Sequence, residues 1–175
     1  MALLEYVDPD SEDLPEYESD SGELSLFRAV LLNNPTVLQR RLDYSGWLRN
    51  EGELDRELKE LAHVVTDRTN ECEYCTDAHT QNLVDVFGFS EERIAAIENR
   101  EFDSFDARER AVMEFAEQVT EDPKRVREAH IEALREVGFS DGDVVELLAL
   151  VTSAISANAM MDALNVHPAD RAQMR

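Results

Sequence analysis

The sequence predicts an all-α protein with a single helical domain of about six to eight helices, and two observations support that prediction. Apolar residues recur at spacings of three and four along most of the chain, as they do on one face of an α-helix. No segment alternates apolar and polar residues between turn signals, as a half-buried strand would. The length of 175 residues suits one domain, and 43% hydrophobic residues are enough to form a core.

Residues 1–23 are expected to form an acidic N-terminal arm ahead of the helical domain. This segment contains Pro9, Pro15 and many carboxylates. Its composition fits either an arm that docks on a partner subunit or a plain solvated tail. The helical domain is assigned to residues 24–165 and a C-terminal tail to residues 166–175.

The first half of this domain should contain four helices. Apolar periodicity places them over residues 24–32, 36–48, 54–66 and 71–87. The first helix ends where Asn34 and Pro35 interrupt the pattern, and Gly88 is a natural stop for the fourth.

Four further helices are expected in the second half, one that begins at Ser90 and three that span 105–119, 123–137 and 140–164. Ser90, Asp106 and Ser140 can each accept hydrogen bonds from the first backbone N–H groups of a helix. The last helix is almost entirely apolar, so it should be central. Residues 88–91 (Gly-Phe-Ser-Glu) and 138–141 (Gly-Phe-Ser-Asp) echo each other, either by chance or because two helical halves are related.

The charge balance excludes some partners and suggests a habitat. Asp and Glu number 39 against 17 Lys and Arg, which gives a net charge of -22. A chain without clustered basic residues is a poor ligand for nucleic acid or for anionic membrane surfaces. Only Lys59 and Lys124 are lysines. Acid excess together with lysine depletion indicates a salt-adapted, halophilic protein, although a soluble acidic protein without salt adaptation is the alternative.

The sequence also predicts a cytoplasmic location. No segment was judged to reach the ~18 consecutive apolar residues of a membrane span, and the N-terminus lacks the pattern of a signal peptide. Cys72 and Cys75 are the two cysteines. In a reducing compartment a pair at this spacing is more often a redox or metal site than a structural disulfide.

The segment from Cys72 to His79 contains the candidate catalytic residues. On an α-helix Cys72, Cys75 and His79 are offset by three and then four residues, so they lie on one face. Unpaired N–H groups at a helix N-terminus stabilise a thiolate, which is the nucleophilic form. His79 can relay a proton. Glu60, on the preceding helix, can approach His79 and orient its ring.

Two other interpretations of the cysteine pair remain open. The thiols can be structural residues that occur at this spacing by chance. A zinc site built from Cys72, Cys75, His79 and Glu60 has acceptable ligand types, but three ligands along one helix close a tetrahedron poorly. Glu60, taken alone, is an unremarkable surface acid in so acidic a chain. The sequence therefore predicts a site with no metal and no cofactor.

Glu60, eleven intervening residues and Cys72-x-x-Cys75-x-x-x-His79 resemble the alkylhydroperoxidase D group of the carboxymuconolactone decarboxylase superfamily. Residues 27–35 and 54–83 resemble the same group, and the resemblance extends over residues 24–165. Tyr74 stands where some relatives carry a second histidine. The decarboxylase branch lacks the cysteine pair, which argues against lactone decarboxylation here.

The resemblance implies an all-α fold that assembles as trimers or hexamers and acts as a thiol-dependent peroxidase or disulfide reductase. Carried over, Cys75 is the attacking thiol, Cys72 the resolving thiol, and Glu60 with His79 the proton relay. Helix position alone favours Cys72 as the more readily ionised thiol, so the two arguments disagree on which cysteine attacks first. His63, one turn after Glu60, is a further candidate for the relay.

The implied substrate is a hydroperoxide, and the implied electron donor is a dithiol, either a small protein or a lipoyl-type group. Two rival functions remain. The protein can pass electrons to another peroxidase as a disulfide-exchange adaptor, or it can be a redox sensor or oligomeric scaffold without turnover.

Overall fold

The computed structural model describes residues 2–8 and 25–174, and every regular element within them is helical. This confirms the predicted all-α class. The elements are α1 (Leu26–Leu31), α2 (Pro35–Asn50), α3 (Arg56–Thr69), α4 (Glu73–Asp85), α5 (Glu91–Glu98), η1 (Phe102–Ser104), α6 (Ala107–Glu121), η2 (Pro123–Arg125), α7 (Glu128–Glu136), α8 (Asp141–Ala163) and η3 (Pro168–Met174), where η marks a 3-10 helix. Most of the expected acidic arm lies outside the described residues.

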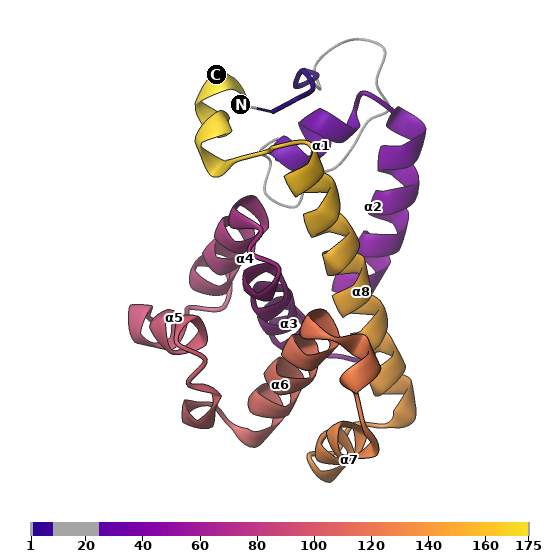
Figure 1. The fold of residues 1–175 in the computed structure, drawn as a ribbon, viewed down its shortest axis with the longest axis vertical. Coiled ribbons are helices and arrows are strands. Elements are labelled where there is room, and N and C mark those ends of the chain that lie inside the picture. Colours follow the sequence, from indigo (N-terminus) through magenta and orange to yellow (C-terminus); the bar gives the residue numbers. More distant parts are fainter. Residues whose placement is uncertain (1, 9–24, 175) are drawn as a thin grey trace.

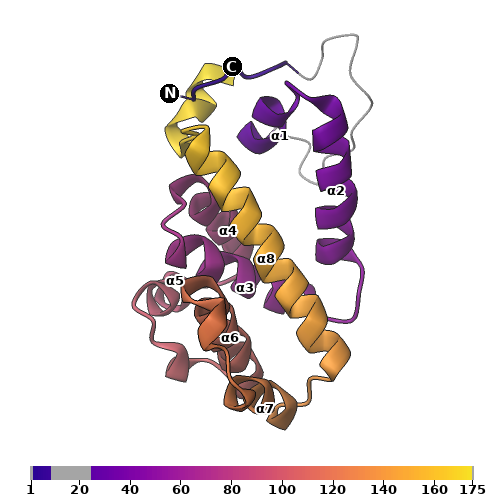
Figure 2. The same ribbon diagram turned by 45° about the vertical axis from the view of Figure 1, so that its right-hand side comes forward.

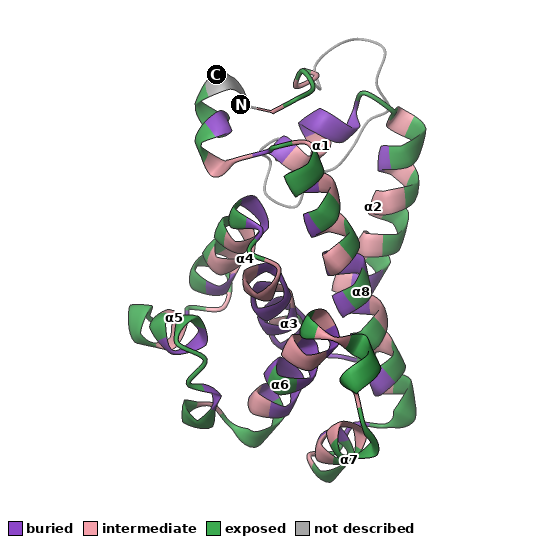
Figure 3. Ribbon diagram, in the orientation of Figure 1, coloured by how far each residue is buried: buried purple, intermediate pink, exposed green. Residues whose placement is uncertain are grey.

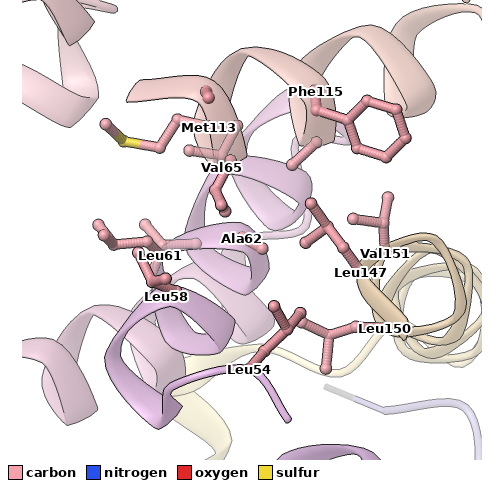
Figure 4. Close-up of a cluster of buried hydrophobic side chains, with 14 of the residues drawn as sticks. Leu54, Leu58, Leu61, Ala62, Val65, Met113, Phe115, Leu147, Leu150 and Val151 are labelled. Carbon is pink, nitrogen blue, oxygen red and sulfur yellow. The ribbon is translucent and has the colours of Figure 1, made fainter. Parts of the chain in front are cut away.

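Helix α3 is the centre of the packing. It contacts α4, α6 and α8, while α2 lies along the other side of α8 (Figures 1 and 2). Buried side chains line the faces that these helices turn toward one another (Figure 3). Figure 4 shows the contact of α3, α6 and α8, where side chains such as Leu61, Met113 and Leu147 meet. Burial of each such side chain stabilises the fold by roughly 1.5–3 kcal/mol, so α3 is held firmly.

A second buried cluster joins the two ends of the chain. Leu26 and Val30 of α1 pack with Met161 of α8 and with both cysteines. The segment 2–8 is tied down by the backbone N–H of Leu3, which donates to the Leu164 carbonyl at 2.8 Å. The start of α4 is therefore covered by the terminal segments of the chain.

The capping residues expected from the sequence are confirmed. Ser90 begins α5 and Ser140 begins α8, each accepting a backbone N–H of the first turn. Asp106 begins α6 and forms a reciprocal capping box with Glu109. These side chains satisfy donors that a helix start leaves unpaired.

The repeated Gly-Phe-Ser sequence forms the same local structure twice. Gly88 (φ 70°) and Gly138 (φ 94°) adopt the left-handed conformation that ends a helix. The phenylalanine that follows each glycine is buried in the main core, and the serine then caps the next helix. The repeated sequence therefore forms a repeated local structure.

Three details differ from the sequence expectations. The helix expected over 123–137 is broken: Asp122 caps the short turn η2, and α7 starts only after extended residues at 126 and 127. Val37 and Trp47 of α2 lie on its exposed face. The statement that no segment is apolar enough to span a membrane is wrong for α8, which meets that criterion by length and composition. One such helix is weak support for a span, because a central helix in a soluble protein can also meet it.

A buried ion pair holds the loop that precedes α3. The Lys59 ammonium group lies 2.7 Å from Glu146 of α8 and donates to the Glu51 carbonyl. Glu146 also accepts the backbone N–H of Glu53 at 2.9 Å. One of the two lysines in the chain therefore ties the loop between α2 and α3 to the central helix.

Candidate functional site

The site is built on the turn between α3 and α4. Asn70 ends α3, and Glu71 adopts a left-handed conformation with a φ of 60°. The Cys72 backbone N–H then donates to the Asp67 carbonyl at 2.9 Å, and Cys72 is the N-cap of α4. This tight reversal sets the buried face of α4 against α3, so residues of both helices share one site.

The two cysteines are free thiols in contact. Their sulfur atoms lie 2.8 Å apart. Cys72 is fully buried, and Cys75 retains 6% of its surface. The hydrogen bond with Cys72, burial and the charge of Asp67 together raise the pKa of the Cys75 thiol. Cys75 is the more exposed of the two thiols.

Glu60 and His79 form a part-buried pair, as expected from their positions: Glu60 is buried, and the His79 side chain is 22% exposed. The Glu60 carboxylate lies 2.6 Å from Nδ1 of His79 and accepts a hydrogen bond from the Asn82 amide at 2.8 Å. Burial opposes ionisation of Glu60, but the charge and hydrogen bond of His79 lower its pKa to about 2. Burial likewise opposes protonation of His79, but Glu60 raises the His79 pKa to about 9. At neutral pH the pair is a carboxylate and an imidazolium.

His63 and Tyr74 occupy different places around this pair. The His63 ring stacks on His79 with centroids 4.3 Å apart and an interplanar angle of 3°. Burial and the neighbouring His79 lower the His63 pKa to about 3, so the ring is neutral. The Tyr74 hydroxyl accepts the backbone N–H of Phe27 at 3.2 Å and links α4 to α1.

A buried amide network lies beside the thiols. The Asn158 amide of α8 donates to the Asp67 carboxylate at 2.6 Å and accepts from the Asn70 side chain at 2.8 Å. The same amide hydrogen-bonds Cys75. Burial raises the Asp67 pKa to about 6 despite the opposing effects of His79 and Asn158. Asp67 is the buried carboxyl whose charge bears on Cys75.

Two acidic residues close to the cysteines in the sequence, Glu73 and Asp77, lie on the surface. Glu73 lies 3.3 Å from His167, and Asp77 lies 2.6 Å from the Arg171 guanidinium. An open pocket of about 450 Å³ lies over this outer part of α4, and none of the four predicted site residues lines it. Within residues 2–8 and 25–174, no group of three or more His, Cys, Asp or Glu side chains is placed to hold a metal ion.

The sequence profile of the carboxymuconolactone decarboxylase family matches residues 35–118. The matched segment is just under half of the chain. Comparison with curated proteins found no match.

Several solved structures share the fold of this chain. An uncharacterized peroxidase-related protein from Silicibacter sp. TM1040 is 22% identical, with a TM-score of 0.77 and 93% of each chain covered. The alkylhydroperoxidase AhpD core of a peroxidase-related protein from Ralstonia eutropha JMP134 is 26% identical, with a TM-score of 0.68 over 80% of this chain and 74% of that one. The debrominase Bmp8 is 19% identical, with a TM-score of 0.74 over 87% and 83%.

The structure forms two contacts among the four predicted site residues, Cys72 with Cys75 and Glu60 with His79, both within the α3–α4 unit. The sequence analysis missed three polar neighbours, Asp67, Asn82 and Asn158. A signal existed for each. Asp67 continues the polar face of α3 that starts at Glu60, Asn82 follows His79 by one turn, and Asn158 interrupts an apolar helix.

Proposed function

We propose that the protein is a thiol-dependent peroxidase that reduces hydroperoxides with electrons from a dithiol donor. The observation that supports this proposal best is the pair of free thiols in contact, 2.8 Å apart, at the start of the helix that also carries His79 paired with Glu60. A close dithiol can cycle through a disulfide with little movement, because an S–S bond is only about 0.8 Å shorter than this contact.

The first step is nucleophilic attack by the Cys75 thiolate on the distal oxygen of the peroxide. An S–O bond forms, the O–O bond breaks, and sulfur gives up two electrons as the alkoxide leaves. The Cys72 thiol then attacks the sulfenic acid, which forms the disulfide and releases water. Exchange with a dithiol donor restores both thiols and leaves the donor as a disulfide.

The Glu60–His79 pair serves this cycle as a proton relay. With the His79 pKa at about 9, the ring is protonated at neutral pH and can give its proton to the departing alkoxide. Glu60 holds Nδ1, so Nε2 of His79 remains for the substrate. The greater exposure of Cys75 supports its assignment as the attacking thiol and Cys72 as the resolving one.

The remaining partners are proposed on the family resemblance alone. They are a small protein or lipoyl-type dithiol as donor and further copies of this chain in a trimer or hexamer. We also propose a cytoplasmic, salt-rich setting and no nucleic-acid or membrane partner, in keeping with the charge of -22. We assign the reaction no cofactor and no metal.

The test is peroxide consumption by purified protein with several dithiol donors, in wild type and in Cys75→Ser. Turnover that depends on the donor and disappears in Cys75→Ser supports a peroxidase. Disulfide exchange without peroxide consumption supports the adaptor alternative. Oxidation that stops after one equivalent of peroxide, seen by mass spectrometry, supports a sensor, and full activity in Cys75→Ser would sink the proposal.

A further inference from the structure

Asp67 is a buried carboxyl group that the proposed mechanism does not use. The residue is 1% exposed, and its Oδ2 atom has no hydrogen-bond partner among the described residues. A buried carboxylate oxygen without a donor is unfavourable, and a proton on that oxygen would remove the charge. Asp67 Oδ2 is therefore a suitable proton acceptor.

A single amide group connects Asp67 to the Cys75 thiol. The Asn158 carbonyl oxygen accepts from Asn70, which turns the Asn158 nitrogen toward Asp67, 2.6 Å away, and the amide also bonds Cys75. One amide can stabilise an anion on either neighbour. The Asp67 charge opposes a charge on Cys75, so one negative charge on the pair is favoured.

The group expected to accept the Cys75 proton is already protonated. His79 faces the Glu60 carboxylate at 2.6 Å and carries a proton at neutral pH. Glu60 remains ionised far below neutral pH. Neither member of that pair can take up the thiol proton under ordinary conditions, so another acceptor is needed.

We propose that Asp67, coupled to Cys75 through Asn158, accepts the proton that Cys75 loses when it becomes the attacking thiolate. The Cys75 S–H bond breaks with its electrons left on sulfur, and an O–H bond forms on Asp67. This rests on the proposed function only in its choice of Cys75 as the nucleophile. The Asp67 pKa of about 6 suits a group that is ionised at rest and can still accept a proton.

The proton balance closes over one cycle. His79 protonates the alkoxide and becomes neutral, and Asp67 then returns the thiol proton to His79. The Cys72 proton leaves with the sulfenic hydroxyl as water. The sum is two thiols and one hydroperoxide converted to a disulfide, an alcohol and water.

Other charged and titratable groups around the pair come from four helices, α2, α3, α4 and α8. Those that act on Asp67 are Glu60 of α3, His79 of α4 and Asp162 of α8. Cys75 interacts electrostatically with Cys72 and Tyr74 at the start of α4 and with Arg41 of α2. Asp67 is the carboxylate in this set whose charge opposes the Cys75 thiolate.

The proposal predicts an unusual pH profile for alkylation of Cys75 by iodoacetamide, measured by peptide mass spectrometry between pH 5 and 9. While the pair holds one proton, the balance between thiolate and carboxylate does not depend on pH. The wild-type rate should rise to about pH 6 and then stay level for at least about one pH unit before rising again. A lone thiol would instead react about tenfold faster for each pH unit below its pKa.

Two variants make the test specific. Asp67→Asn keeps the shape of the side chain and should abolish the level region, so that alkylation at pH 8 becomes at least about tenfold faster than in wild type. Asp77→Asn removes an equal charge two residues past Cys75, on the surface, and should keep the wild-type profile. Circular dichroism confirms that each variant is folded.

A wild-type profile with no level region would overturn the proposal, even if Asp67→Asn could not be purified. Loss of the level region in Asp77→Asn as well would also overturn it, because a general charge effect would then be responsible. Alkylation needs no peroxide turnover. A protein that shows the level region but consumes no peroxide would refute the peroxidase proposal and leave this one standing.

Discussion

The part-buried Glu60–His79 pair should make the stability of the protein depend on pH above neutrality. In the folded protein the His79 pKa is about 9, against 6.5 for an ordinary histidine. A raised pKa contributes stability that is fully present below pH 6.5 and is lost as pH rises through 9. A difference of this size corresponds to about 3 kcal/mol. In Glu60→Gln the carboxylate is gone and burial lowers the His79 pKa, so this contribution disappears.

The assay is urea unfolding at pH 7 and pH 10 for wild type, Glu60→Gln and the control Glu73→Gln, which removes a surface carboxylate beside His167. Wild type and Glu73→Gln should lose about 3 kcal/mol more than Glu60→Gln over this range. The same variant should slow peroxide turnover about a hundredfold, because a neutral His79 cannot protonate the leaving alkoxide. An equal loss of stability in all three proteins would refute the reasoning.

Three further predictions concern the frame of the site and the charge around it. Lys59→Met should destabilise the fold by about 3–5 kcal/mol in urea unfolding by leaving Glu146 buried without its partner, and adding Glu146→Gln should recover part of the loss. Gly52→Ala should cost about 1–3 kcal/mol, because its φ is +88° and a Cβ would lie 2.3 Å from Glu146, whereas Gly46→Ala, in open space within α2, should gain about 0.5–1 kcal/mol. Peroxide turnover should rise with salt concentration, because salt screens the exposed acids beside the dithiol; a salt-independent rate in folded protein would contradict this.

Helix starts and stops could be predicted because they depend on local chemistry. A serine or aspartate before an apolar periodic run accepts N–H groups wherever the rest of the chain lies, so Ser90, Asp106 and Ser140 were identified correctly. The break after Pro123 was not predicted. It depends on a side-chain cap by Asp122 and on the His130 ring, which accepts the Arg127 backbone N–H.

The candidate site, too, could be predicted from the sequence only in part. The offsets of three and four residues from Cys72 to His79 placed those side chains on one helix face, and a short link brought Glu60 opposite. The burial of Asp67 and its contact with Asn158 join residues 91 positions apart. Such a contact depends on how α8 packs on α3, which periodicity does not specify.

Burial separates the charges of this protein into two sets with different roles. On the surface, Glu73 and Asp77 face His167 and Arg171 across exposed pairs, where water and salt weaken each interaction to about 1 kcal/mol or less. Inside, the carboxylates of Glu60 and Asp67 are shielded from solvent, so each acts strongly on its neighbour. Salt therefore acts on the dithiol through the surface acids, while the buried carboxylates keep their strong effect at any salt concentration. A protein with a large net negative charge can in this way keep the His79 imidazolium and the reactive Cys75 thiol in their protonation states.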